Sequence, residues 1–369
     1  MMELTRRRLL TTGTAVAGIG GLAGCVDGSI GQNADSNTAD TTTARSSFFV
    51  FGDVASRIAG SAADAELLVP VGQHGHGWEP GPSVREEIHE ADLFVHGMEG
   101  FQPWVDTIKH DLEADGSDVV PIDASAGISL IEAGDSGHDH DDEHGDDHTD
   151  DEHGDDHTDE HGDDHTDDEH GHDHDDEHGD DHTDEHDDEH GEGMDPHFWM
   201  DPLRMKDTVE TVRQGLTDVD PENADVYAEN AESFSDRLDE LHGEIESIVA
   251  NASNDVILIA GHDSFGYFSD RYDVRVEALT SVSPDDIPTP QDIQNAQEII
   301  STHDLRYICA DPLESQQAAE QLVAETDIEE VLPLTAMPGL TDEWAADDWG
   351  YLDVMESVNL PTIERIVNT

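Results

Sequence analysis

Lysine is almost absent from this sequence: a chain of 369 residues contains only Lys109 and Lys206, and all Lys and Arg together number 15 against 90 Asp and Glu. A formal net charge of −75 offers no basic surface for phosphate groups, which argues against nucleic acid as a partner. Two cysteines are too few for a disulfide framework. Beyond the N-terminal region, no apolar run is long enough to cross a bilayer.

The acidic excess extends over the whole chain. Residues 138–190 hold 29 acidic residues and 15 histidines with no Lys or Arg, but the remainder still has 61 acidic against 15 basic residues. At molar ionic strength the Debye length falls to roughly 3 Å, which screens such self-repulsion. The excess outside 138–190 therefore predicts a protein adapted to concentrated salt, whereas the histidines of 138–190 need a separate explanation.

The N-terminus predicts export and lipid anchoring. Three arginines at 6–8 precede a short, glycine-rich apolar run that fits a signal peptide better than a membrane span, and the paired arginines resemble a twin-arginine export signal. The sequence LAGC ending at Cys25 resembles a lipobox, in which that cysteine is lipidated after cleavage; the alternative is an ordinary signal peptide with an incidental cysteine. We expect a signal peptide over 1–24 and a flexible polar tether over 25–46, with the mature protein at the outer face of the membrane.

Short apolar runs alternate with amphipathic stretches on both sides of 138–190, which predicts an α/β protein with parallel sheets flanked by helices. We expect an N-terminal lobe over 47–220, interrupted by the insertion 138–190, and a C-terminal lobe over 252–369. Strands are predicted at 48–51, 66–71, 92–96, 118–122, 255–260, 273–279, 305–310 and 328–334. Helices are predicted near 53–60, 83–90, 101–114, 202–217, 264–271, 290–302, 313–325 and 349–358.

A long helix is predicted between the lobes, over 221–251. Its apolar residues recur at alternating steps of four and three, from Tyr227 to Ile248, which is one continuous helical stripe. At 1.5 Å per residue such a helix runs roughly 45 Å, enough to pass beside both lobes. A coiled-coil dimer is the alternative, but packing of the stripe on the chain's own lobes is favoured, and we expect a monomer.

Three histidine-bearing segments stand at predicted strand-to-helix junctions, where α/β proteins place their ligands. HGWEPGPSV begins at His76, DPHFWMDP contains His197, and GHDSFGYF contains His262. These motifs resemble H-x-Y-E-P-x-P-S-D, D-P-H-x-W-L-x-P and a matching third segment of the zinc/manganese branch of the solute-binding proteins of ABC transporters. MEGFQPWVDTI and IPTPQDI are also similar to segments of that family.

The resemblance implies a fold and a function. It implies two Rossmann-like lobes joined by one backbone helix, with a metal ion held in the interlobe cleft by His76, His197 and His262. It also implies an ABC permease and its ATPase as partners. Manganese-type members commonly have Glu at the third position, whereas this chain has His262. Three neutral imidazoles suit Zn²⁺ better than the harder Mn²⁺.

The fourth ligand is not evident from the sequence. The family usually supplies an Asp after a late strand of the C-terminal lobe, but here that stretch reads VLPLTAMPGL, with Thr335 at about the expected place. A water molecule, His74 or Glu79 are the other candidates for the fourth position. For His74 we favour an accessory role beside the site over direct ligation.

The segment 138–190 repeats units such as DDEHGDDHT and has too few apolar residues to fold alone, so we expect it to be disordered without metal. Acidity explains the carboxylates but not the histidines, and imidazole is a common ligand of divalent metals. We therefore favour metal capture or sensing over a solvated loop. The histidines of this tract are His138, His140, His144, His148, His153, His157, His161, His165, His170, His172, His174, His178, His182, His186 and His190.

Taken together, the sequence predicts a lipid-anchored extracytoplasmic receptor that binds Zn²⁺ as cargo and delivers it to a permease. Within the same class, Mn²⁺ or another divalent cation is the alternative cargo. A zinc hydrolase is the rival from a different class, encouraged by the open fourth position, but the chain has no His-Glu-x-x-His motif. We therefore predict that the protein is not an enzyme. A surface zinc buffer without a transporter is the third reading.

Overall fold

The computed structural model describes residues 41–134, 193–254 and 256–368. The predictions for the signal peptide, for Cys25 and for the histidine tract 138–190 concern residues outside these ranges. The described residues belong to one compact unit.

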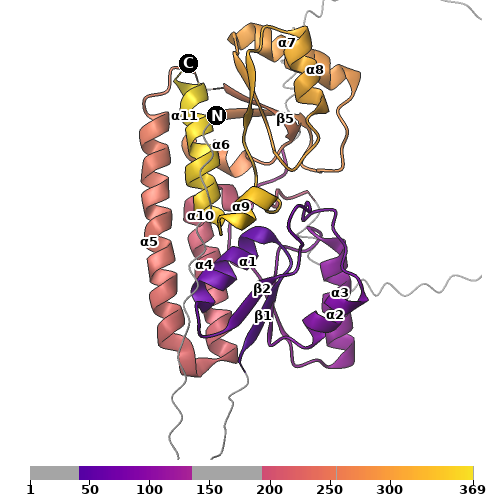
Figure 1. The fold of residues 1–369 in the computed structure, drawn as a ribbon, viewed down its shortest axis with the longest axis vertical. Coiled ribbons are helices and arrows are strands. Elements are labelled where there is room, and N and C mark those ends of the chain that lie inside the picture. The colour runs from indigo at the N-terminus through magenta and orange to yellow at the C-terminus, as the bar shows by residue number, and fades with distance from the viewer. Residues whose placement is uncertain (1–40, 135–192, 255, 369) are drawn as a thin grey trace, which may run out of the picture. The chain divides into compact units, whose positions relative to one another are not determined.

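The first lobe is built on a four-stranded parallel sheet with the strand order β2-β1-β3-β4 (Figure 1). Its elements up to the insertion are β1 (Thr43–Ser46), α1 (Phe49–Ala59), β2 (Asp64–Leu67), α2 (Pro82–His89), β3 (Leu93–His96), α3 (Pro103–Asp115) and β4 (Val120–Asp123). After the insertion, a 3-10 turn η1 (Phe198–Met200) leads into α4 (Pro202–Val219), which packs on β3, β4 and α1.

The second lobe repeats this design with a parallel sheet in the order β6-β5-β7-β8. Its elements are β5 (Val256–His262), α6 (Gly266–Tyr272), β6 (Arg275–Thr280), α7 (Pro290–His303), β7 (Tyr307–Ala310), α8 (Gln317–Glu325), β8 (Glu330–Pro333), α9 (Asp342–Ala346), α10 (Tyr351–Val354), the π-helical turn η3 (Met355–Asn359) and α11 (Leu360–Val367). Two parallel sheets flanked by helices confirm the predicted fold class.

The prediction was wrong at the beginning of the first lobe. Residues 43–46 form β1, which lies between β2 and β3, although we expected them in the tether. The run 48–51, predicted as a strand, instead forms the N-cap and first residues of α1, and Phe49, Val50 and Phe51 are all buried. The sheet and helices α4, α5 and α10 cover most of α1, so most of its residues are apolar. A short apolar run such as 48–51 does not by itself distinguish a helix from a strand.

The long helix lies close to its predicted position. A 3-10 turn η2 (Pro221–Asn223) precedes α5 (Ala224–Val249), which packs on α1 and α4 of the first lobe and on α6, α10 and α11 of the second (Figure 1). The apolar stripe from Tyr227 to Ile245 is buried in these contacts. The stripe therefore packs against the chain's own lobes, the arrangement that we favoured over a coiled-coil dimer.

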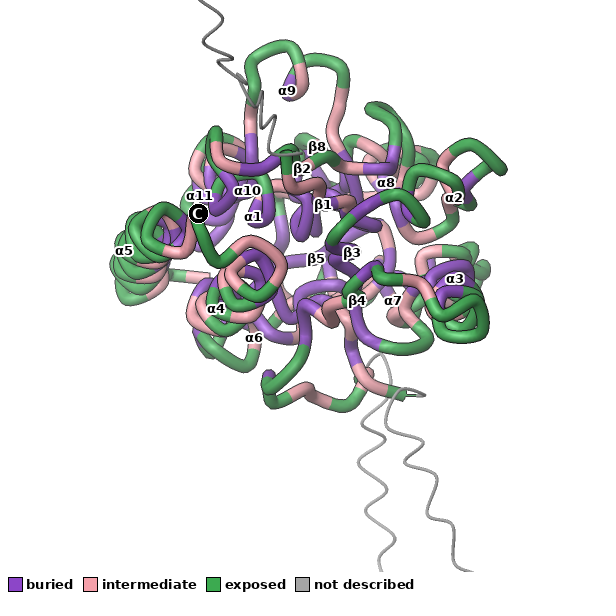
Figure 2. The backbone as a smooth tube through the Cα atoms, turned by 90° about the horizontal axis from the view of Figure 1, so that it is seen from below, coloured by how far each residue is buried: buried purple, intermediate pink, exposed green. Residues whose placement is uncertain are grey.

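Burial concentrates on the strands and on the inner faces of the helices. Figure 2 shows β3 and β5 buried near the middle of the molecule, whereas the outer side of α5 is exposed. Cys309 in β7 is fully buried and free. Among the described helices, none has the length and apolar character needed to cross a membrane.

Candidate metal centre

Three histidines that are distant in sequence meet where the two lobes face each other. His76 lies in the loop between β2 and α2, His197 directly precedes η1, and His262 is the last residue of β5. Each offers one ring nitrogen, and these three atoms lie within 4.8 Å of one another. The structure thus brings together the three residues that the motifs single out as ligands.

The loop that carries His76 is held tightly against the second lobe. The Gly75 N–H donates to the Pro338 carbonyl at 2.8 Å, and Gln102 Nε2 donates to the Gly75 carbonyl at 2.9 Å. A Cβ at position 75 would stand 2.7 Å from the Phe48 ring and 2.8 Å from the Pro338 oxygen, so only glycine fits here. The His76 ring packs edge-on against Phe48 and Phe101, with ring centroids 5.2 and 4.6 Å away.

A carboxylate fixes the orientation of the His197 ring. Oδ1 of Asp195 accepts hydrogen bonds from both the backbone N–H and Nδ1 of His197, each at 2.8 Å. Because a carboxylate only accepts, the proton of the imidazole is on Nδ1, and Nε2 has a free lone pair. Both side chains are almost completely buried. The arrangement is the one by which proteins prepare histidine as a metal ligand.

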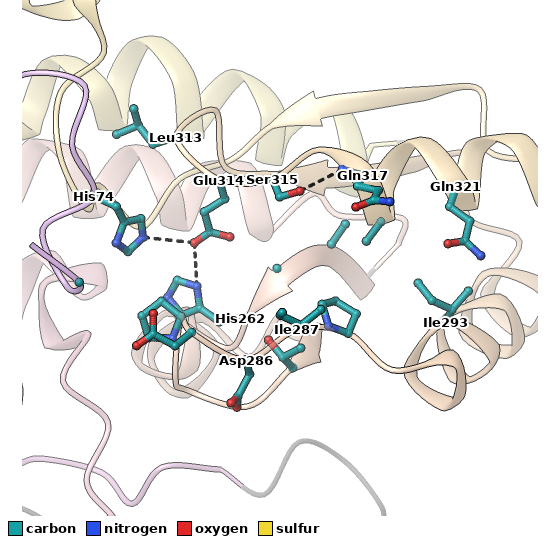
Figure 3. A pocket seen from close by; sticks show the side chains of 18 of the residues that line it. His74, His262, Asp286, Ile287, Ile293, Leu313, Glu314, Ser315, Gln317 and Gln321 are labelled. Carbon is teal, nitrogen blue, oxygen red and sulfur yellow. Dashed lines mark hydrogen bonds and ion pairs between the residues drawn. The ribbon is translucent and has the colours of Figure 1, made fainter.

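His262 has a comparable partner in Glu314, which follows β7. Nδ1 of His262 lies 2.8 Å from Oε1 of Glu314, a contact that again favours the proton on Nδ1 (Figure 3). The Nε2 atoms of His262 and His197 then face each other at 3.3 Å. Two ligands of a tetrahedral zinc ion with bonds of about 2.0–2.1 Å stand about 3.3 Å apart, so this separation fits a shared ion.

Burial favours the neutral form of two of the imidazoles, those of His76 and His197. It lowers the pKa of His197 below its usual 6.5, although the charge of Asp195 acts in the opposite direction. Burial and the neighbouring histidines hold the pKa of His76 well below 6.5. Neutral imidazoles whose lone pairs face one another repel unless a cation lies between them. The cluster can therefore bind a divalent metal ion without first releasing protons.

The other candidate residues lie in different positions. His74 is outside the three-atom cluster, with its ring centroid 5.1 Å from that of His76 and 6.2 Å from that of His262. Glu79 is exposed and does not join the cluster. The Thr335 hydroxyl is already used: it donates to Asp311 Oδ2 at 2.5 Å and accepts from the Met337 N–H at 2.8 Å. Thr335 therefore holds the loop after β8 in place. Its two hydrogen bonds speak against the suggested role of fourth ligand.

Sequence reasoning missed Glu314 and Asp311. Both follow β7, and β7 pairs with β5, so the carboxyl ends of the two strands bring these acids to the edge where His262 lies. Burial, and then the charge of Glu314, raises the pKa of Asp311 to about 6. An acidic residue directly after a buried strand was the available signal, but only the strand order connects it to His262.

The two ends of the insertion meet beside the cluster. Glu132 and Met194 form an antiparallel bridge, the Ala133 N–H donates to the Gly193 carbonyl at 2.7 Å, and the Asp195 N–H donates to the Ile131 carbonyl at 2.9 Å. The predicted tract 138–190 is therefore inserted between paired segments, and its C-terminal flank leads within a few residues to His197.

Two parallel-sheet lobes with imidazoles converging between them define a two-lobed binding protein with a candidate metal site in its cleft. The profile of the family described as the periplasmic component A of the zinc-uptake complex, ZnuA, matches residues 45–366. The chain therefore belongs to that family, which confirms the resemblance read from the motifs.

Individual relatives agree with this assignment. The high-affinity zinc uptake system protein ZnuA of Bacillus subtilis is 25% identical over 335 residues, which cover 91% of this chain and 90% of the relative. The zinc-binding protein AdcA of Streptococcus pyogenes serotype M3 is 26% identical over 307 residues, and the match spans 83% of this chain but only 52% of AdcA. The chain thus corresponds to about half of the AdcA proteins.

Solved structures show the same fold. The Zn(II)-bound ZnuA-like domain of Streptococcus pneumoniae AdcA aligns with a TM-score of 0.65 at 21% identity, over 89% of this chain and all of that one. The laminin-binding protein Lmb of Streptococcus agalactiae aligns with a TM-score of 0.67 at 17% identity, over 89% of this chain and all of that one.

Proposed function

We propose that this protein is an extracytoplasmic receptor that captures Zn²⁺ with His76, His197 and His262 and delivers it to an ABC permease driven by its ATPase. Membership of the zinc-uptake family and the names of the relatives support zinc as cargo. The observation that carries the proposal is the pair of facing Nε2 atoms of His197 and His262, 3.3 Å apart, with a carboxylate beside each Nδ1.

The donor set favours zinc over manganese. Three imidazole nitrogens suit the borderline-soft Zn²⁺, whereas Mn²⁺ prefers carboxylate and water oxygen. The carboxylates of Asp195 and Glu314 face Nδ1 atoms of the two histidines, where they orient the rings. We propose no catalytic role for either acid, because this arrangement commits both to the imidazoles.

Export and anchoring complete the proposal. The three arginines at 6–8 and the LAGC sequence ending at Cys25 support twin-arginine export followed by lipidation of Cys25. A relative that is 24% identical over 318 residues is named the zinc-binding lipoprotein AdcA of Streptococcus pneumoniae. The proposed location is the outer face of the cell membrane, in a salt-adapted organism.

The tract 138–190 is proposed as an auxiliary zinc collector. Its 15 histidines supply many ligands, and its flank at Asp195 leads directly to His197. Ordering a polar segment around each ion costs conformational entropy, so these sites bind more weakly than the cleft.

Titration calorimetry in concentrated salt tests the receptor. Zn²⁺ and Mn²⁺ are titrated into the full chain and into a variant in which a short Gly-Ser linker replaces 135–192, whose flanks already meet at the Glu132–Met194 bridge. We expect the shortened variant to retain one tight zinc site and to bind manganese at least about 100-fold more weakly. Loss of all tight zinc binding on removal of the tract contradicts the proposal and favours a surface zinc buffer.

The pH dependence of zinc binding follows from the lowered pKa values. A histidine whose pKa lies below 6.5 is already neutral at pH 7, so Zn²⁺ displaces no proton from His76 or His197 there. We expect the zinc Kd of the shortened variant to change little between about pH 8 and 7 and to rise as the pH falls below about 6.5, where protons compete. Calorimetry across this range checks it, and a tenfold weakening between pH 8 and 7 contradicts it.

A further inference from the structure

A cavity of about 770 Å³ opens beside the three-histidine cluster and is lined by residues of both lobes. His262 lines this cavity, whereas His76 and His197 do not. Figure 3 shows His74 and Glu314 beside His262 on one side of the cavity, with Ile293 and Gln321 on the other. An ion that arrives through the cavity therefore meets His74, Glu314 and His262 before it reaches His76 and His197, which do not line it.

Nε2 of His74 and Oε1 of Glu314 face one another beside the His262 ring. Nε2 of His74 is shielded from solvent and has no well-formed hydrogen bond. It lies 3.5 Å from Oε1 of Glu314, the oxygen that also faces Nδ1 of His262 at 2.8 Å. A charge-assisted hydrogen bond is shorter, about 2.7–2.9 Å. The separation is close to the roughly 3.3 Å between two ligands of one tetrahedral zinc ion. Leaving the shielded Nε2 of His74 without a partner costs free energy, and a cation bound between it and Glu314 Oε1 removes that cost.

The Glu314 carboxylate is held in place by its loop. The Glu314 N–H donates to the Asp311 carbonyl at 3.1 Å, and Gln316 Nε2 bridges the carbonyls of Asp311 and Glu314. A Cβ at Gly261 would stand 2.7 Å from Glu314 Oε2, so the glycine at this point of β5 makes room for the carboxylate. Two more acids, Asp285 and Asp286, line the same cavity and attract cations towards it.

We propose that His74 and Glu314 form an outer zinc site through which the ion is loaded into, and released from, the cluster of His76, His197 and His262. This inference rests on the proposed function of that cluster. The outer site offers Nε2 of His74 and Oε1 of Glu314, and water completes the coordination of the ion there. The outer site has two protein ligands and the three-histidine cluster has three, so the outer site binds zinc more weakly and only transiently. Exchange of waters for protein ligands in stages lowers the barrier in both directions.

The test compares His74→Ala with His110→Ala in the full chain, because His110 is exposed on α3. Tryptophan fluorescence reports on the cleft, since Trp78 lines the cavity, Trp199 packs on His197, and the tract 138–190 contains no tryptophan. Stopped-flow mixing gives the association rate with Zn²⁺, and excess chelator gives the release rate. We expect His74→Ala to slow both rates about tenfold and to change the Kd by less than about threefold.

A rescue variant separates a ligand role from loss of packing. His74→Asp restores a zinc-binding side chain at the same place, so both rates should recover towards those of the His110→Ala control. A weaker Kd with an unchanged association rate overturns the proposal, because His74 is then a ligand of the final site. Rates that do not respond to His74→Ala also overturn it, as does slowing that His74→Asp fails to relieve.

Failure of the outer site and failure of the proposed function give different results. His197→Ala is measured in the same assay. If this variant keeps tight zinc binding, the three-histidine site itself is wrong. If it loses tight binding while His74→Ala behaves as the control, the receptor stands and only the outer site is excluded.

Discussion

Replacing His197 with alanine should remove tight zinc binding. His197 is fully buried, its Nδ1 is held by Asp195 at 2.8 Å, and its Nε2 faces His262 at 3.3 Å, so alanine removes one of the three nitrogens of the cluster. Structural zinc sites gain about 10–16 kcal/mol of apparent binding free energy. If each of the three protein ligands contributes about a third of this free energy, loss of one ligand weakens the Kd by roughly 1000-fold.

Calorimetry of the variant in which a linker replaces 135–192 measures this loss without the tract histidines. His110→Ala serves as the matched control, because it removes an exposed imidazole from α3 and should leave the affinity unchanged. Thermal unfolding without zinc shows whether the cavity left by His197→Ala has destabilised the fold. Retention of a Kd within about tenfold of the parent would place the tight site elsewhere.

The candidate ligands were predictable because each lies in a short motif with its own local signature. HGWEPGPSV, DPHFWMDP and GHDSFGYF identify His76, His197 and His262 without any knowledge of the pairing of strands. The long helix was predictable for a similar reason, since its stripe from Tyr227 to Ile245 follows one periodicity.

What could not be predicted depends on tertiary packing. Glu314 approaches His262 only because β7 pairs with β5, and no local pattern records that pairing. The run 48–51 begins a helix whose apolar residues pack against the sheet and other helices, and the run alone does not show this. Thr335 was a candidate for the fourth ligand, but its hydroxyl is bonded to Asp311.

The second large effect is expected at the contact between the loop carrying His76 and the loop after β8. The Gly72 N–H donates to the Leu340 carbonyl, and the Gly75 N–H donates to the Pro338 carbonyl, both at 2.8 Å. Gly339 lies between these acceptors, and a Cβ there would stand 2.3 Å from the backbone oxygen of Gln73. Gly339 has no positive φ, so the obstacle to a side chain is steric rather than conformational.

Gly339→Ala should therefore force the two loops apart. A backbone oxygen cannot rotate away as a side-chain end can, so we expect a loss of about 2–3 kcal/mol in the free energy of unfolding. Because His76 lies on the displaced loop, zinc affinity should fall by about 10- to 100-fold, the range seen when groups that orient metal ligands are lost. Denaturant unfolding and calorimetry measure the two effects.

Gly243→Ala supplies the control of opposite sign. Gly243 is exposed within α5 and a Cβ there meets no atom within 4 Å, so alanine should stabilise the helix by about 1 kcal/mol without affecting zinc. If Gly339→Ala and Gly243→Ala behave alike, the contact between the two loops is not under steric constraint. If Gly339→Ala loses stability but keeps its zinc affinity, the loop after β8 supports the fold without positioning His76. Loss of both, in this variant alone, shows that the second lobe holds the first lobe's ligand in place.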